Sequence, residues 1–385
     1  MISFNRYFYF LISISVISAT YLLAGETETK IGEIVNTEIA SGSFPGAVVY
    51  IGKGEDTLFY EAFGFAVSTP FKAKMHKNMI FDIASLSKPV ATASSIMVLI
   101  DQKKIDLDAK VSSYIPAFAQ NGKENVKIKH LLSHTSGLPS YMSVAGLMIP
   151  DGKSNPEKVF AKICSLKNQY EAGGKCQYSC LGYITLGKIV ETVSGMPLDK
   201  FAAEKLFKPL GMNDTLYNPP KELEEKIVAT TVAKGVVNRG KVHDPLASKM
   251  GGVSGNAGVF TTASDLAKYC RMLMNGGCCI SDDKRILSES SVKLLTSDIA
   301  YGRAYGFDVN SEAHSWIKGD CFGKSVFCHS GYTGTSIVCD PVSKVFIIIL
   351  TNRVHPTDNG RTKNVRKKIA DIICETYSRS TSNDG

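Results

Sequence analysis

The stretch TSIVCDPVSKVFIIILT, residues Thr335–Thr351, contains two β-rich runs separated by a polar segment. The runs are Thr335–Cys339 and Val345–Thr351, and residues 340–344 between them carry a proline and small polar residues typical of a turn. The second run is apolar at almost every position, which is typical of a strand buried on both faces. The stretch therefore predicts a β-hairpin whose second strand lies inside a sheet.

Strand signals recur at the opposite end of the chain. Gly46–Ile51 and Thr57–Phe63 are β-rich runs joined by GKGED, the composition of a hairpin turn. After the C-terminal hairpin, apolar residues recur at helical spacing within residues 361–377. A second hairpin and a terminal amphipathic helix are therefore expected.

Helical patterns dominate the middle of the chain, as in Pro89–Gln102, Leu181–Ser194 and Leu198–Phe207. Strands at both ends with helices between them predict an α+β fold. We expect a sheet lobe of about residues 31–84 and 300–377, into which a mostly helical lobe of about residues 85–299 is inserted.

The N-terminus differs in composition from the rest of the 385 residues, which are globular in character with 44% apolar residues overall. Arg6 precedes an apolar run, Phe8–Ala24, and Gly25 and a polar segment follow, which is the order of a secretory signal. Residues 1–25 are therefore expected to direct export to the periplasm or the cell exterior, and residues 26–385 to form the catalytic domain. Membrane anchoring through residues 8–24 is the alternative if the segment is not cleaved.

Charge and cysteine spacing exclude several kinds of partner. The formal charge of +8 is spread along the chain without a clustered basic helix, so no nucleic-acid partner is expected. The ten cysteines include no C-x-x-C pair and the histidines lack metal-like spacing, so we expect no metal and no cofactor. Export would let some cysteines pair. Cys321 and Cys328 could face each other across a hairpin, but spacing does not fix the pairing.

The first candidate for chemistry is Ser85-Leu86-Ser87-Lys88, which places a nucleophile and a base one helical turn apart. A lysine whose pKa is lowered can take the serine proton. Pro89 lacks an N–H, which a helix can spare only in its first four residues, so a helix begins near Ser85. The pattern alone leaves an ordinary helix N-cap open, because the same spacing also starts at Ser281, Ser290 and Ser315. A nucleophile of the α/β-hydrolase type is excluded because the chain has no G-x-S-x-G.

Five blocks carry a resemblance to a known family. In chain order they are FDIASLSK (81–88), LLSHTSGLP (131–139), PLGM (209–212), GGVSGNAG (251–258) and HSGYTGT (329–335). Together they resemble the serine β-lactamase-related family, which includes class C β-lactamases, D-alanyl-D-alanine peptidases, D-aminopeptidases and family VIII carboxylesterases. The resemblance covers about residues 31–375. It implies an antiparallel sheet flanked by helices, and a serine hydrolase in which Ser85 forms an acyl-enzyme with Lys88 beside it.

The resemblance also implies a second group in proton transfer. Tyr178 stands where the family has the tyrosine of a Y-x-N motif, which helps the lysine move protons. Cys180 stands where the asparagine of that motif is usual, and a thiol is a weak donor and a weak acceptor. Binding of a substrate amide by Cys180 and its support of Lys88 are therefore in question, and a small buried core residue is the alternative reading.

The last block implies the substrate-binding residues His329, Ser330, Gly331 and Tyr332. By the resemblance, His329 would face the carboxylate or leaving group of the substrate. Gly331 would let the substrate lie close to a strand, and the backbone N–H of Tyr332 would join that of Ser85 in an oxyanion hole.

The expected partner is a small-molecule or peptide substrate: a peptidoglycan-related D-alanyl peptide, a small ester or a β-lactam. A true β-lactamase and a sensor that retains the acyl group are the alternatives. A histidine with an ordinary pKa near 6.5 is mostly neutral at pH 7.5, and Cys180 offers no amide. We therefore expect poor hydrolysis of β-lactams relative to activated esters.

Overall fold

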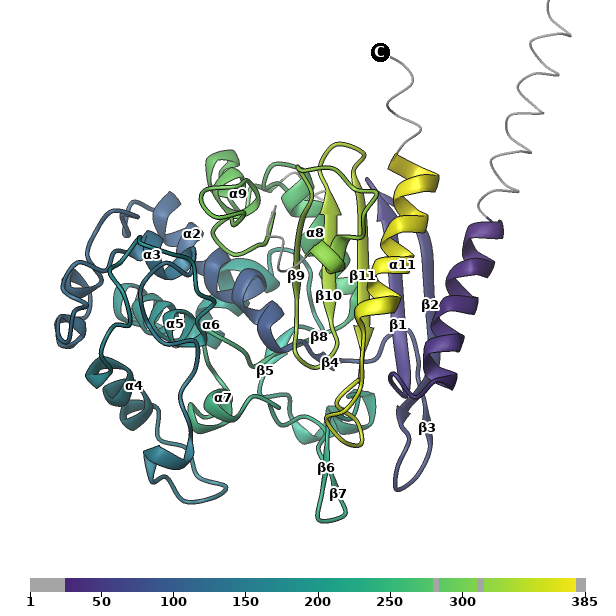
Figure 1. Ribbon diagram of the computed structural model, residues 1–385, viewed down its shortest axis with the longest axis horizontal. Coiled ribbons are helices and arrows are strands. Elements are labelled where there is room, and N and C mark those ends of the chain that lie inside the picture. Colours follow the sequence, from purple (N-terminus) through teal and green to yellow (C-terminus); the bar gives the residue numbers. More distant parts are fainter. Residues whose placement is uncertain (1–24, 280–283, 310–314, 379–385) are drawn as a thin grey trace, which may run out of the picture.

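The computed structural model describes residues 25–279, 284–309 and 315–378. Its centre is an antiparallel sheet to which both ends of the chain contribute (Figure 1). In spatial order the strands are β3 (Ala73–Lys74), β2 (Asp56–Val67), β1 (Gly46–Lys53), β11 (Val345–Thr351), β10 (Ser336–Asp340) and β9 (Phe327–Ser330). The strands β1 and β11 pair from Ala47 opposite Thr351 to Lys53 opposite Val345, so strands almost 300 residues apart lie side by side.

Helices cover both faces of this sheet. A helix over residues 25–40, α10 (Ser315–Lys318) and α11 (Lys363–Ile373) lie on one face, and the other helices lie on the opposite side and beyond it (Figure 1). The further α-helices among the described residues are α2 (Ser94–Asp101), α3 (Ile128–Leu132), α4 (Pro156–Ser165), α5 (Cys180–Ser194), α6 (Leu198–Ala202), α7 (Pro245–Lys249), α8 (Ala263–Met274), α9 (Glu289–Thr296), α10 (Ser315–Lys318) and α11 (Lys363–Ile373).

The alternation of side chains along the central strands divides the core in two. Val345, Ile347 and Ile349 of β11 pack with the residue 25–40 helix and with α11. Their neighbours Phe346, Ile348 and Leu350 point the other way, into a larger core shared with α2, α5 and α8. Every residue of β11 is buried, as the apolar run in the sequence predicted. The predicted α+β class is therefore confirmed.

The expected helices are present with small differences. Leu181–Ser194 begins one residue earlier as α5, and Leu198–Phe207 is α6 followed by a π-helical turn, η6 (Ala203–Phe207). Pro89–Gln102 is divided into a π-helical turn, η2 (Lys88–Ala93), and α2. The remaining 3₁₀ turns are η1 (Ala84–Leu86), η3 (Val111–Ser113), η4 (Pro116–Phe118), η5 (Ala145–Leu147) and η7 (Lys221–Lys226), and η9 (Cys374–Ser378) is a π-helical turn after α11.

A strand of a small second sheet directly precedes the candidate nucleophile in the chain. Its strands are β4 (Phe81–Asp82), β8 (Val259–Thr261) and β5 (Leu216–Tyr217), and a separate hairpin joins β6 (Val232–Ala233) and β7 (Val236–Val237). After β4, Ala84 adopts a left-handed backbone with φ of 46°, and its N–H donates to Asp82 Oδ1 at 2.9 Å. The turn that carries Ser85 is therefore held by the buried carboxylate of Asp82.

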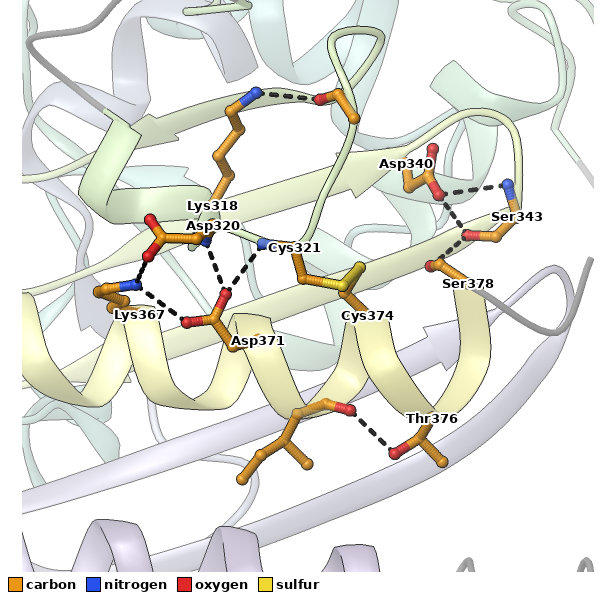
Figure 2. Close-up of a disulfide and its surroundings, with 12 residues drawn as sticks. Lys318, Asp320, Cys321, Asp340, Ser343, Lys367, Asp371, Cys374, Thr376 and Ser378 are labelled. Atoms are coloured by element: carbon orange, nitrogen blue, oxygen red, sulfur yellow. Dashed lines mark hydrogen bonds and ion pairs between the residues drawn. A yellow bond between two sulfur atoms is a disulfide. The ribbon is translucent and has the colours of Figure 1, made fainter. Parts of the chain in front are cut away.

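The disulfide joins a different pair from the one considered in the sequence. Cys321 bonds to Cys374 (Figure 2). Cys328, in contrast, is a free thiol buried in β9. Cys374 follows α11 directly, and tertiary packing brings it beside the loop after α10. Around the bond, Asp371 Oδ1 accepts from the backbone N–H groups of Asp320 and Cys321.

The expected signal or anchor, residues 1–25, lies almost wholly outside the described residues. Within the described ranges, none of the helices combines the length and the apolar character that crossing a membrane requires.

Candidate active site

Ser85 and Lys88 meet at the start of the helix that leads into α2. Lys88 Nζ donates to Ser85 Oγ at 3.0 Å, and Ser85 lines a cavity of about 490 Å³. Lys88 itself is fully buried. The competing serines differ: Ser290 bonds to Ser288 on an exposed surface, Lys318 near Ser315 donates to the carbonyl of Gly323, and Ser281 lies outside the described residues.

The surroundings of Lys88 act on its pKa in opposite directions. Burial lowers the pKa, and the negative charges of Cys180 and Tyr178, where ionised, together with Asp244, raise it, so the net shift is upward. Among these influences, burial is the one that favours the neutral amine, and only the neutral amine can accept the Ser85 proton.

Tyr178 completes the group around Ser85. Its hydroxyl is within hydrogen-bonding reach of Lys88 and Ser85, and its ring lies 4.9 Å from Lys88 Nζ. Burial raises the pKa of Tyr178, while the neighbouring Lys88 cation lowers it, and the net shift is upward. The phenol therefore keeps its proton at neutral pH and can donate it. Rings of His134 and His329 flank Tyr178 at centroid distances of 4.5 and 6.3 Å.

Cys180 is the first residue of α5. Its backbone N–H donates to Ser140 O at 2.8 Å, and its side chain is partly exposed and lies near enough to act on the pKa of Lys88. The thiol thus lies near the lysine, and its part in substrate binding stays a prediction.

The HSG block forms the end of β9 and one wall of the cavity. His329 is buried and Ser330 is half-buried, and both line the cavity with Gly331 and Tyr332. A Cβ at Gly331 would meet Ile83 O and Thr335 Oγ1 at 2.2 Å each. The glycine is therefore required by close packing within the protein, and the expected approach of substrate to it stays a prediction.

The backbone N–H groups of Ser85 and Tyr332 have no acceptor within the ranges that the structure describes. Both the side chain and the main chain of Tyr332 are held by hydrogen bonds. Its hydroxyl donates to Asp358 at 2.6 Å, and Arg353 Nε donates to its carbonyl oxygen at 2.6 Å. A fixed main chain with a free N–H is what an oxyanion hole requires.

A set of cations on the far side of the cavity was missed by the sequence analysis. Arg353, Arg361, Lys363 and Arg366 line the same cavity as Ser85. Arg366 is 3% exposed, donates to Thr335 O at 2.8 Å and leaves its Nε without an acceptor. Burial lowers its pKa to about 9, with the nearby Arg353 cation as a further cause.

In the sequence, the only sign of these four cations is the run of basic residues in the terminal helix. Such a run by itself indicates a solvated helix face. In the described part of the chain, no three His, Cys, Asp or Glu side chains are grouped so that they could hold a metal ion.

The arrangement provides the parts of acyl transfer. A serine hydroxyl touches a buried lysine, a phenol reaches both, two backbone N–H groups are free, and cations line the space beyond. Groups of these kinds can act as a nucleophile, a base, a proton donor, an oxyanion site and a site for an anionic substrate group.

Comparison with known proteins agrees with this chemistry. The family model described as Beta-lactamase matches residues 31–371. A Bacillus subtilis (strain 168) protein named N-acetylmuramyl-L-alanine amidase is 31% identical over 359 residues, which cover 85% of this chain and 81% of that protein. An Escherichia coli (strain K12) protein, whose name assigns it provisionally as a D-alanyl-D-alanine carboxypeptidase, is 30% identical over 83% of this chain and 81% of its own length. The solved structure of EstCE1, described as a hydrolase with promiscuous acyltransferase activity, shares the fold with a TM-score of 0.75 at 21% identity, covering 92% of this chain and all of that one.

Proposed function

Because this chain belongs to the β-lactamase family and is a serine hydrolase of that family, we propose that it is exported and forms an acyl-enzyme on Ser85, with cell-wall D-alanyl peptides or small esters as substrates. The observation that carries the proposal is the 3.0 Å contact between Lys88 Nζ and Ser85 Oγ at the wall of the cavity.

The proposed reaction begins with attack of Ser85 Oγ on the carbonyl carbon while its proton moves to Lys88. The carbonyl oxygen gains negative charge and accepts from the N–H groups of Ser85 and Tyr332. The proton then passes through the Tyr178 hydroxyl to the leaving group, and the carbon–heteroatom bond breaks. Water attacks the acyl-enzyme by the same route in reverse.

The cation set supports a substrate with a carboxylate. Within the part of the chain that the structure describes, Arg366 is buried without an acidic partner, and such a cation gains most from an anion brought into its cavity. Arg353, by contrast, is paired with Asp358 at 3.0 Å. The names of the relatives point to peptides of the cell wall, which end in a carboxylate.

This set also changes the expectation for β-lactams. That expectation assigned the carboxylate to His329, but the arginines can bind it at any neutral pH. Only the weak thiol of Cys180 then remains as a reason for poor β-lactam hydrolysis. A true β-lactamase and a sensor therefore remain as outcomes of the test.

The proposed export is supported by the bond between Cys321 and Cys374, because disulfides persist mainly in oxidising compartments. Membrane anchoring through residues 8–24 is the alternative to cleavage. Fractionation of cells that produce the full chain, followed by N-terminal sequencing, distinguishes a cleaved protein from an anchored one, and a protein found in the cytoplasm contradicts export.

The test of the proposed function uses purified protein lacking residues 1–25 with a p-nitrophenyl ester, a D-Ala-D-Ala peptide and a chromogenic cephalosporin. We expect turnover beyond one equivalent and, by mass spectrometry, a phosphonate adduct on Ser85. Ser85→Ala should abolish both, whereas Ser290→Ala and Ser315→Ala should not. Full activity of Ser85→Ala contradicts the proposal, and a single burst without turnover identifies a sensor.

A further inference from the structure

The amine of Lys88 is hydrogen-bonded to a loop rather than to Cys180, the residue that stands where the family usually has asparagine. Lys88 Nζ donates to Asn256 O at 2.9 Å as well as to Ser85 Oγ. Asn256 belongs to the segment of residues 251–258, here named the Asn256 loop. Since the Cys180 thiol is a poor acceptor, the Asn256 carbonyl is the strong main-chain contact of the base.

The side chain of Asn256 is fixed at both of its polar atoms. Its Oδ1 accepts from Ser254 Oγ at 2.8 Å, and its Nδ2 donates to Asp244 Oδ1 at 3.1 Å. Asn256 is 1% exposed, so these contacts are made away from bulk water. Asp244 therefore helps to set the direction in which the Asn256 carbonyl points.

The Asn256 loop is pressed against the helix that carries the base. Thr92 Oγ1 donates to Gly255 O at 2.8 Å, and Val259 N donates to Ser87 Oγ at 3.0 Å. A Cβ at Gly255 would lie 1.9 Å from Tyr183 O of α5, so only glycine fits there. The loop has no room to move its carbonyl away from Lys88 while Asp244 and these contacts hold.

We propose that Asp244 is a positioning residue for Lys88: it holds the Asn256 carbonyl against the amine and compensates the charge that Lys88 gains when it takes the Ser85 proton. This inference rests on the proposed acyl-enzyme role of Ser85. In the step concerned, the Ser85 O–H bond breaks, the proton binds the nitrogen lone pair of Lys88, and the oxygen bonds to the substrate carbonyl carbon. Asp244 keeps its charge throughout, and Lys88 loses the proton again to the leaving group through Tyr178.

The charge of Asp244 acts on Lys88 in the required direction. It is among the causes that raise the pKa of Lys88, against the lowering effect of burial. Cys180 and Tyr178 face Lys88 from α5 and the segment before it, and the Tyr183 ring lies 5.8 Å from Nζ.

Asp244 has charged and polar neighbours of its own. Its Oδ2 accepts from the Tyr141 hydroxyl at 3.1 Å, and the buried Asp82 lies close enough for the two carboxylates to affect each other. Asp82 is occupied by the N–H groups of Ala84 and His243. Asp244 is thus the carboxylate whose hydrogen bonds lead to the base.

The test separates the charge of Asp244 from its hydrogen bond. Asp244→Asn keeps an acceptor for Asn256 and for the N–H of Ala247 in α7, since Asn and Asp cap helices equally well. We expect the ascending limb of the kcat/KM profile for p-nitrophenyl butyrate to move to lower pH by about half a unit to one unit, because Lys88 loses a neighbouring negative charge. The plateau should fall by about threefold to tenfold because the base is weaker.

Asn256→Ala keeps the main-chain carbonyl of residue 256 and the Asp244 charge, but it removes the side-chain amide that is hydrogen-bonded to Asp244. It should lower kcat by about tenfold or more with KM unchanged and with the limb within experimental error of its original position. Asp108→Asn, which removes a surface carboxylate paired with Lys127 and Lys129, is the matched control. It should change neither kcat nor the pH of the ascending limb of the kcat/KM profile.

Two outcomes overturn the inference: an Asp244→Asn profile that coincides with the wild type, or an Asn256→Ala protein with unchanged kcat. If Asp244→Asn fails to fold, as judged by its thermal transition, the Asn256→Ala result decides. Phosphonate labelling of Ser85 is measured in parallel. Normal labelling with no effect of either variant rejects the role of Asp244 alone, whereas absent labelling in the wild type rejects the proposed function.

Discussion

Lys88 is a cation-forming group placed where water does not reach it, with Ser85 and Asn256 as acceptors and Tyr178 beside it. Ser85 and Tyr178 line the cavity, whereas Lys88 exchanges protons only through these neighbours. At the residue scale, the proposed function therefore treats the three side chains as one proton-transfer unit rather than three independent contributors.

Single substitutions within this unit should cost nearly as much as the double one. Lys88→Ala and Tyr178→Phe should each lower kcat for the ester by about 10²-fold or more, and the double variant should lose far less than the product. Steady-state kinetics of the four proteins measures this. Losses that multiply would mean that the two residues act in separate steps.

Local spacing explains which of these residues the sequence could predict. Ser85 and Lys88 share one helical turn, and Pro89 fixes where that helix begins, so their contact follows from the chain itself. Tyr178 was accessible only through its resemblance to a motif. Asp244 and Arg366 carry no local signal, since the packing of the Asn256 loop and of α11 alone brings them to the site.

At the scale of elements, α11 does two things at once. Its apolar side, with Val365, Ile369 and Ile373, packs on the sheet, and its first turns carry Lys363 and Arg366 to the cavity. The periodicity in the sequence predicted the first role because burial repeats every three to four residues. The second role depends on where β9 ends, which periodicity does not describe.

Arg366 should decide the preference between charged and neutral substrates. Arg366→Met keeps much of the aliphatic stem and removes the guanidinium, whose Cζ lies 5.3 Å from the centre of the Trp316 ring. We expect kcat/KM for a carboxylate-bearing peptide or cephalosporin to fall by about tenfold or more, as for loss of a charged hydrogen bond, and that for a p-nitrophenyl ester to stay unchanged. Lys368→Ala, an exposed cation on the same helix, is the control. Equal losses on both substrates would show that Arg366 supports the fold and not the choice of substrate.

At the scale of the whole molecule, the disulfide fastens the end of α11 to the loop after α10. Cys321 and Cys374 are 53 residues apart in sequence, so a bond between them restricts the unfolded chain substantially. On a chain-entropy estimate, such a loop contributes about 4 kcal/mol to the free energy of unfolding.

The double variant Cys321→Ser/Cys374→Ser should therefore unfold at a clearly lower urea concentration than the wild type. Dithiothreitol should lower the wild-type midpoint toward that of the variant and leave the variant unchanged. Equal midpoints for the oxidised wild type and the variant would show that the bond contributes nothing to stability.

The pairing of β1 with β11 also determines when the central sheet can form during synthesis. A ribosome makes Gly46–Lys53 almost 300 residues before Val345–Thr351, so during all of that synthesis β1 lacks one of its two neighbours. Before the final strand emerges, β1 can pair only with β2, and a two-stranded ribbon is marginally stable in water. The central sheet thus closes only after β11 has been made, which suits the proposed export, because a chain crosses a membrane more readily before it has folded.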